Sequence, residues 1–182
     1  MIVYTVGHST RAIEDFVTLL NAFDIETLVD VRTIARSRHN PQYNEAELDA
    51  SLRANGISYI RLVGLGGLRH TASASINTAW KNLSFRGYAD YMQTPEFLDS
   101  LGQLTRIAAG KRTVIMCAEA VPWRCHRSLI GDALLIRGAS VEDIFTEKSI
   151  RPHRLTAFAR IAGNTISYPA GMAGPCRGPR SA

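Results

Sequence analysis

The chain has few cysteines and no long hydrophobic run. Three cysteines among 182 residues are too few, and odd in number, for a disulfide framework, so we expect reduced thiols. No segment approaches the ~18 consecutive apolar residues that a membrane helix needs, which excludes a membrane partner. The N-terminus shows neither a basic region nor a cleavage site, so no signal peptide is expected. These absences predict a cytoplasmic protein.

Lysine is also scarce. Only Lys81, Lys111 and Lys148 contribute to the 21 basic residues, so arginine carries most of the positive charge behind the net charge of +5. Arginine makes planar, two-pronged contacts with phosphate and carboxylate groups, which indicates an anionic ligand. A genome rich in arginine codons would produce the same composition. The positions of the arginines are therefore more informative than their number.

Short β-rich segments alternate with amphipathic helical segments. The expected strands are residues 2–6, 27–32, 57–63, 112–116 and 140–146. The expected helices are residues 13–23, 44–54, 85–92 and 95–109, and one that starts after Arg127. This alternation predicts an α/β fold, with an open, mostly parallel sheet of about five strands and helices on both faces, in a Rossmann-like three-layer arrangement.

We expect one domain over residues 1–167. Residues 168–182 are rich in proline, glycine and arginine and predict a disordered tail, which contains Cys176. Residues 68–82 are rich in alanine and serine and fit helix, loop or lid equally well.

The densest group of reactive side chains follows the fourth expected strand. Residues 117–127 read CAEAVPWRCHR and bring two cysteines, a glutamate, a histidine and two arginines to one turn before a helix. Open α/β sheets bind ligands at the carboxyl ends of their strands, facing the N-terminus of the next helix. This turn is therefore the expected centre of the site.

Polar or glycine-rich turns follow three other strands. His8 and Ser9 follow the first, Asp30 and Arg32 the second, and a run from Gly64 to Gly67 the third. In a parallel sheet these ends share one rim, so the groups can converge. We assign catalysis to Cys117, Glu119, His126 and His8. We assign ligand binding to Ser9, Asp30, Arg32, Arg36, Arg38, Cys125 and Arg127.

The GHS turn, the LVDVR strand, the arginine-rich loop, the LGG turn and the CAE…CHR segment together resemble the domain of unknown function 488 family. The resemblance covers residues 2–150 and implies a small cytosolic prokaryotic α/β domain. It points to His8, Ser9, Asp30, Arg32, Cys117, Glu119, Cys125, His126 and Arg127. The name of the family implies no activity, so the resemblance supports the fold more than a function.

Thiolate chemistry is the first of three hypotheses. A helix N-terminus and neighbouring basic side chains lower a thiol pKa, which would make Cys117 or Cys125 a nucleophile. The layout is similar to the phosphate-binding loops of cysteine phosphatases and rhodaneses. However, Trp123 stands where the phosphatase signature has arginine, and Glu119 would repel phosphate. Alternatively, Cys117 is a buried residue at a strand end.

Metal binding is the second hypothesis. Cys117, Cys125 and His126 could bind zinc together with His8 or Glu119. Adjacent residues are an unusual ligand pair, and the separation of the two cysteines is not a zinc-finger spacing. We therefore assign no metal ligands, and the sequence identifies no cofactor.

Binding or hydrolysis of a nucleotide or nucleic-acid fragment is the third hypothesis. Arginines would hold phosphate, Glu119 or Asp30 would act as the base, and His8 or His126 as the acid. Tyr43, Tyr59 and Trp123 are candidate stacking platforms, although Tyr59 is better explained by core packing. Equally, Asp30 could form an internal salt bridge with Arg32, and His8 could simply occupy a helix-capping turn.

A non-enzymatic alternative stays open, in which Cys117 and Cys125 form a reversible disulfide in a redox-sensing or partner-binding module. The arginines lie in loops rather than along one helix, which favours a pocket over a nucleic-acid groove binder. We therefore expect a small anionic, phosphate-bearing or nucleotide-like ligand, with hydrolase or transferase activity as the working hypothesis. A nucleic acid is the less favoured partner, and these patterns set no oligomeric state.

Overall fold

The computed structural model describes residues 1–171. The strands of its main sheet are β1 (Ile2–Gly7), β2 (Thr27–Asp30), β3 (Ser58–Arg61), β4 (Thr113–Cys117), β5 (Ser140–Thr146) and β6 (Ser149–Pro152). The α-helices are α1 (Ile13–Asn21), α2 (Glu45–Ala54), α3 (Leu83–Tyr91), α4 (Pro95–Gly110) and α5 (Arg127–Leu135). Short 3₁₀ helices lie at η1 (Pro41–Tyr43), η2 (Val63–Leu65) and η3 (Pro122–Arg124).

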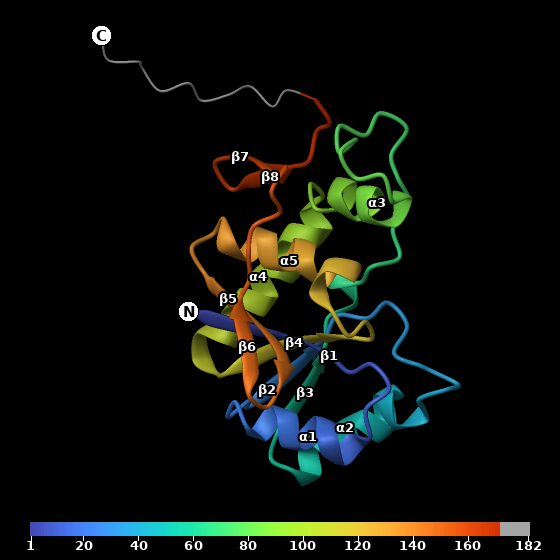
Figure 1. The fold of residues 1–182 in the computed structure, drawn as a ribbon, viewed down its shortest axis with the longest axis vertical. Helices are drawn as coiled ribbons and strands as arrows, with labels where there is room; N and C mark the ends of the chain where they lie inside the picture. Colours follow the sequence, from blue (N-terminus) through green and yellow to red (C-terminus); the bar gives the residue numbers. More distant parts are fainter. Residues whose placement is uncertain (172–182) are drawn as a thin grey trace.

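The strand order is β3-β2-β4-β1-β5-β6. The first five strands are parallel, and β6 pairs with β5 in the antiparallel direction. Helices α1 and α2 lie on one side of the sheet and α3, α4 and α5 on the other (Figure 1). The predicted α/β fold, with its mostly parallel sheet between two helical layers, is confirmed.

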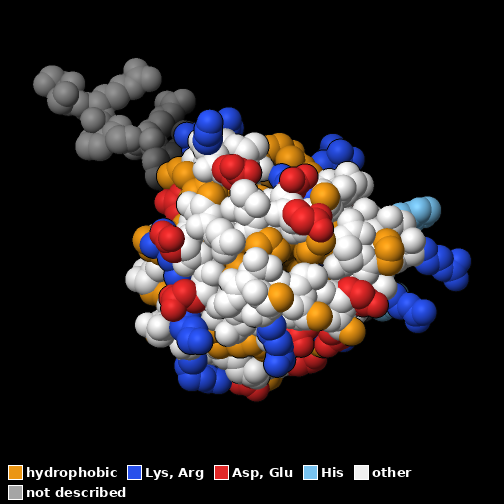
Figure 2. All heavy atoms as spheres, turned by 90° about the horizontal axis from the view of Figure 1, so that it is seen from below, with side chains coloured by type: hydrophobic (Ala, Val, Ile, Leu, Met, Phe, Trp, Pro, Cys, Tyr) orange, Lys and Arg blue, Asp and Glu red, His pale blue; other side chains and the backbone are white. Residues whose placement is uncertain are grey.

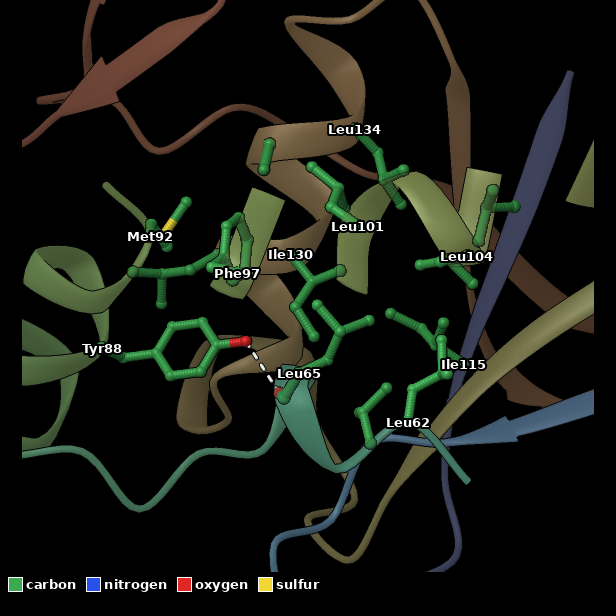
Figure 3. Close-up of a cluster of buried hydrophobic side chains, with 14 of the residues drawn as sticks. Leu62, Leu65, Tyr88, Met92, Phe97, Leu101, Leu104, Ile115, Ile130 and Leu134 are labelled. Carbon is green, nitrogen blue, oxygen red and sulfur yellow. Dashed lines mark hydrogen bonds between the residues drawn. The ribbon is translucent and has the colours of Figure 1, made fainter. Parts of the chain in front are cut away.

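Alternating side chains of the strands supply a core on each face of the sheet. In β4, Val114 and Met116 pack in the cluster beneath α1 and α2, whereas Ile115 packs in the cluster beneath α4 and α5. Figure 3 shows the second cluster, in which Leu104 and Ile130 approach the sheet from the helical layer. Because both faces are covered, the central strands read as continuous apolar runs in the sequence.

The strands β1 and β4 are neighbours, and the chain that follows each of them continues toward a different edge of the sheet. After β1 the chain passes through α1 to β2, and after β4 it passes through α5 to β5, on the other side of β1. The two helices lie on opposite faces of the sheet. Such a reversal opens a crevice at the carboxyl ends of the two strands, where α/β proteins bind ligands.

The structure adds three strands that we did not predict. Besides β6, a hairpin forms between β7 (Arg160–Ala162) and β8 (Thr165–Ser167). Its turn contains Gly163 at φ 58°, a backbone conformation that glycine adopts readily. The Gly163-Asn164 pair between two short apolar segments is a known hairpin signal, so this element was recognisable in the sequence.

The expected tail begins at Tyr168, but this residue is fully buried. Its hydroxyl donates to Oδ2 of Asp132 at 2.8 Å, and its amide donates to Oδ1 of Asn77 at 2.8 Å. The packed chain therefore continues beyond residue 167. The hydrogen bond to Asn77 joins it to the segment 68–82, which forms turns rather than a helix. Residues 172–182, including Cys176, lie outside the described residues.

The residue that precedes α2 is not a side-chain cap. Asn44 precedes α2, but its side chain does not cap the helix. Its Oδ1 accepts a hydrogen bond from the amide of Ser37 at 2.8 Å instead. Asn44 thus holds the arginine-rich loop between β2 and α2.

Among the described residues, no helix combines the length and apolar character that crossing a membrane requires. Figure 2 shows basic, acidic and hydrophobic side chains mixed across the face drawn there.

Candidate functional site

The turns after β1 and β4 meet, as the sequence predicts. The amide of His8 donates to the carbonyl oxygen of Cys117 at 3.0 Å, and the amide of Ser9 donates to that of Ala118 at 2.9 Å. Gly7 permits this approach, because a Cβ at that position would overlap the carbonyl of Glu119. The GHS and CHR segments therefore share one rim of the sheet.

Two cysteines and a histidine form a compact cluster at this rim. Sγ of Cys117 lies 3.9 Å from Nδ1 of His126, and Sγ of Cys125 lies 3.7 Å from the same nitrogen. Both cysteines are buried and free. Among the described residues, this is the group of three donor side chains whose ligand atoms all lie within 4.8 Å of one another.

The imidazole of His126 is held in one orientation. Its Nε2 lies 2.9 Å from the carbonyl oxygen of Val31. A carbonyl oxygen only accepts, so Nε2 carries a proton, and Nδ1 is the nitrogen that faces the two sulfurs. Gly67 packs against the ring: a Cβ at Gly67 would lie 2.5 Å from Nδ1. The glycine turn after β3 therefore makes room for the histidine.

The two thiols differ in acidity. A hydrogen bond from Cys125 lowers the pKa of Cys117 well below the ordinary range against the opposing effect of burial, and His126 and Arg127 lower it further. The same hydrogen bond, together with burial, raises the pKa of Cys125. Cys117 is thus the sulfur that ionises first, with Cys125 as its donor.

The cluster faces a cavity of about 460 Å³. Cys117, Cys125 and His126 line it together with Glu119 and Arg124. The N-terminal part of α3 supplies further lining residues that we did not predict, which are Asn82, Ser84 and Phe85. Asn82 is also the N-cap of α3, accepting from the amide of Ser84 at 2.8 Å.

A second cavity of about 410 Å³ adjoins the first. Both are lined by Arg32, Ile34, Ala118 and Glu119. Ser9 and Arg36 line only the second, and Ser9 adopts φ 53° in the turn. Arg38 is exposed but is not among the residues that line either cavity. Glu119 therefore stands between two cavities, each with one exposed arginine.

Asp30 and Arg32 form a buried ion pair with each other rather than presenting free charges to a ligand. Nε and Nη2 of Arg32 donate to both carboxylate oxygens of fully buried Asp30, and Tyr59 donates to Oδ2 of Asp30 at 2.8 Å. Nη2 of Arg32 also donates to the carbonyl of Tyr43. A carboxylate enclosed in this way does not fit the predicted roles of Asp30 as base or ligand-binding group. The alternative, an internal salt bridge, fits.

His8 is also enclosed. Its Nδ1 lies 2.8 Å from the carbonyl oxygen of Ser9, and its Nε2 lies 3.3 Å from Nη1 of Arg32. Its ring stacks on Tyr43 at 3.9 Å. Burial and the Arg32 charge outweigh the hydrogen bond to Ser9 and lower the pKa of His8 to about 4. Because a neutral imidazole has no proton on Nε2 here, the predicted role of His8 as an acid does not fit.

Arg127 does not face a cavity. Its side chain is 1% exposed, and its guanidinium donates to the carbonyl oxygens of Glu119 at 2.5 Å and Ala120 at 3.0 Å. It therefore shapes the loop after β4 instead of holding a ligand, contrary to our prediction. Arg124, three residues earlier, is exposed and lines the cavity over Cys117.

Comparison with protein families matches residues 12–134 to the family described as Domain of unknown function DUF488. The matched segment contains every residue of the thiol cluster and most of both cavities, but not the turn after β1. Neither the curated proteins nor the solved structures gave a match.

Proposed function

This chain belongs to the DUF488 family, whose description assigns no activity, and we propose from the site itself that it binds an anionic, phosphate-bearing ligand in the cavity over Cys117 and hydrolyses or transfers a group of that ligand. The observation that carries this proposal is the thiol and imidazole cluster that lines a 460 Å³ cavity at the switch point of a parallel sheet. The volume lies in the range of small-molecule sites.

The charged groups around the cavities have separate roles in this proposal. Arg124 and Arg36 are exposed guanidinium groups at the two cavities, able to make two-pronged contacts with phosphate oxygens. Glu119, which lines both cavities, is the proton acceptor. In a hydrolysis, a water oxygen bonds to phosphorus, Glu119 takes a proton from that water, and the leaving oxygen departs with the electrons of the broken P–O bond.

His126 has a positioning role. Its Nε2 proton is engaged with Val31, and its Nδ1 faces the sulfurs. It therefore orients the cluster rather than delivering a proton to the ligand, which changes the role that we predicted from the sequence.

The binding step is tested with inorganic phosphate and adenosine monophosphate as probes, by calorimetry on the full chain. Arg124→Gln should weaken the binding of the probes about tenfold or more, because a charge-assisted hydrogen bond contributes about 1.5–3 kcal/mol. Arg106→Gln is the matched control, since Arg106 is exposed on α4 and lines neither cavity. If no probe binds, or if both variants lose affinity equally, the proposal fails.

A reversible disulfide is the second candidate function, favoured by the closeness of the sulfurs of Cys117 and Cys125, which lie within 4.8 Å of each other. Mild peroxide would oxidise the two thiols to a disulfide and be reduced to water. Intact-mass measurement would then show the loss of two hydrogens in the wild type and in Cys176→Ser, but not in Cys125→Ser. The disulfide candidate needs reduced thiols at the start, which supports the cytoplasmic location that we propose.

A further inference from the structure

The cluster of Cys117, Cys125 and His126 presents three donor atoms to a single point. Nδ1 of His126 offers one position for a hydrogen bond, yet two sulfurs lie at 3.9 Å and 3.7 Å from it. Only one sulfur can occupy that position at a time. With the ring neutral, a cation at this point would engage both sulfurs and the nitrogen simultaneously.

The separations of these atoms suit a tetrahedral cation. Zinc bonds to sulfur at about 2.3 Å and to nitrogen at about 2.0 Å, so sulfur and nitrogen ligands on one zinc ion lie about 3.6 Å apart. The two observed separations are within a few tenths of an ångström of this value. Binding would therefore require little movement of the backbone.

Cys125 and His126 are adjacent in the sequence, which argues against their acting as a ligand pair. The backbone conformation of the two residues removes this objection. Cys125 is extended, at φ −136° and ψ 144°, whereas His126 is helical, at φ −57° and ψ −19°. The change of direction between them brings both donor atoms to the same side. Neighbouring residues can thus act as a ligand pair at the start of α5.

Two surrounding features match those of metal centres. The hydrogen bond from Nε2 of His126 to Val31 fixes the ring and leaves Nδ1 free, which is the usual outer contact of a metal-ligating histidine. The cavity that the three residues line gives an entry path and space for a fourth, exchangeable ligand.

We propose that Cys117, Cys125 and His126 bind one soft divalent cation, zinc by preference, with an open position facing the 460 Å³ cavity. This inference rests on the proposed function in one respect, because it takes the ligand of the cavity to be anionic. A bare thiolate beside Glu119 would repel a phosphate group, whereas a divalent cation neutralises two thiolates and removes that repulsion. Cys117 is then a metal ligand rather than a free nucleophile.

The test uses the full chain, freed of metal by a chelator and titrated with Co²⁺ alone. We expect one Co²⁺ per chain, with a thiolate-to-cobalt charge-transfer absorption that Zn²⁺ abolishes by displacement. Cys125→Ser and His126→Ala should each weaken Co²⁺ binding more than about 100-fold, because loss of an outer contact alone costs 10–100-fold. Cys176→Ser is the matched control and should bind like the wild type. Absence of the charge-transfer absorption, or equal affinity in Cys125→Ser and Cys176→Ser, would overturn the inference.

A measurement on the wild type covers the case in which a variant does not fold. Zn²⁺ should slow the alkylation of Cys117 and Cys125 at least tenfold without slowing that of Cys176, as read by peptide mass spectrometry. Equal rates with and without Zn²⁺ would also overturn the inference. Zinc binding without phosphate binding would refute only the proposed function, and phosphate binding without zinc binding would refute only the cation site.

Discussion

Nδ1 of His153 lies 2.9 Å from Oδ2 of Asp143, joining the segment after β6 to β5. On the other side of the ring, Nε2 lies 3.4 Å from Oδ1 of Asp132 in α5, close enough for an ion pair although without the geometry of a hydrogen bond. Burial lowers the pKa of His153, but the two carboxylates outweigh it and raise the pKa to about 9. The protonated ring is therefore what holds two buried carboxylates side by side.

This relationship predicts loss of stability in alkali. The pKa of His153 is higher in the folded chain than its ordinary value of 6.5, so its contribution is fully present below about pH 6.5 and disappears as the pH rises through about 9. The shift corresponds to about 3 kcal/mol. Urea unfolding of the wild type across this range should show the decrease, and His153→Gln should lack it.

His39→Gln is the control for that experiment, because His39 is exposed. It should follow the wild-type curve. A wild-type chain whose unfolding free energy does not change between about pH 6.5 and pH 9.5 would contradict the assignment.

A second prediction concerns the acidity of Cys117. In metal-free protein, the rate of its alkylation should reach half its maximum well below the pH typical of a free cysteine, because Cys125 donates a hydrogen bond to its sulfur. Cys125→Ala removes the donor, so the midpoint for Cys117 should rise. Mass spectrometry of the alkylated peptides gives both rates. An unchanged midpoint in Cys125→Ala would show that another group sets the acidity.

The shared rim of the site was predictable from the sequence. Parallel strands that end at Gly7 and Cys117 share a rim wherever they stand in the sheet, so the sequence pattern sufficed to bring the segments that follow them together. Strand order itself was not predictable. The direct pairing of β1 with β4 depends on contacts between residues more than a hundred positions apart.

The roles of the arginines could not be predicted in the same way. Arg127 and Arg124 have the same side chain and similar positions in the motif, yet the first is buried on loop carbonyls and the second is exposed at the cavity. Only the path of the loop after β4 separates these outcomes. Similarly, the burial of Tyr168 depends on Asn77 and Asp132, which lie far away in the sequence.

A third prediction tests Glu119. Its side chain is exposed on a loop, so Glu119→Gln should change the free energy of unfolding by no more than about 0.5 kcal/mol. Binding of adenosine monophosphate should stay equal or strengthen, since a negative charge leaves the cavity. Turnover of any phosphate ester that the wild type cleaves should be lost, because the proton acceptor is gone. Unfolding of this variant in a thermal melt would show that Glu119 is structural and remove it from the mechanism.

The fourth prediction concerns the contact between Gly67 and His126. A Cβ at Gly67 would lie 2.5 Å from Nδ1 of the imidazole and 2.8 Å from its Cγ, so Gly67→Ala must displace the ring. Overpacking of this kind costs about 1–3 kcal/mol in the free energy of unfolding. The displaced Nδ1 would no longer face the two sulfurs, so Co²⁺ affinity should fall along with thermal stability.

Gly110→Ala provides the matched comparison, because a Cβ there has no neighbouring atom within 4 Å. Gly110 is the last residue of α4, where alanine is the better helix former by up to about 1 kcal/mol. This variant should keep the wild-type Co²⁺ affinity and melt at the same temperature or higher. The two alanine variants differ only in whether the new methyl group meets an imidazole. Equal behaviour of the two would therefore mean that the position of His126 does not depend on the glycine turn after β3.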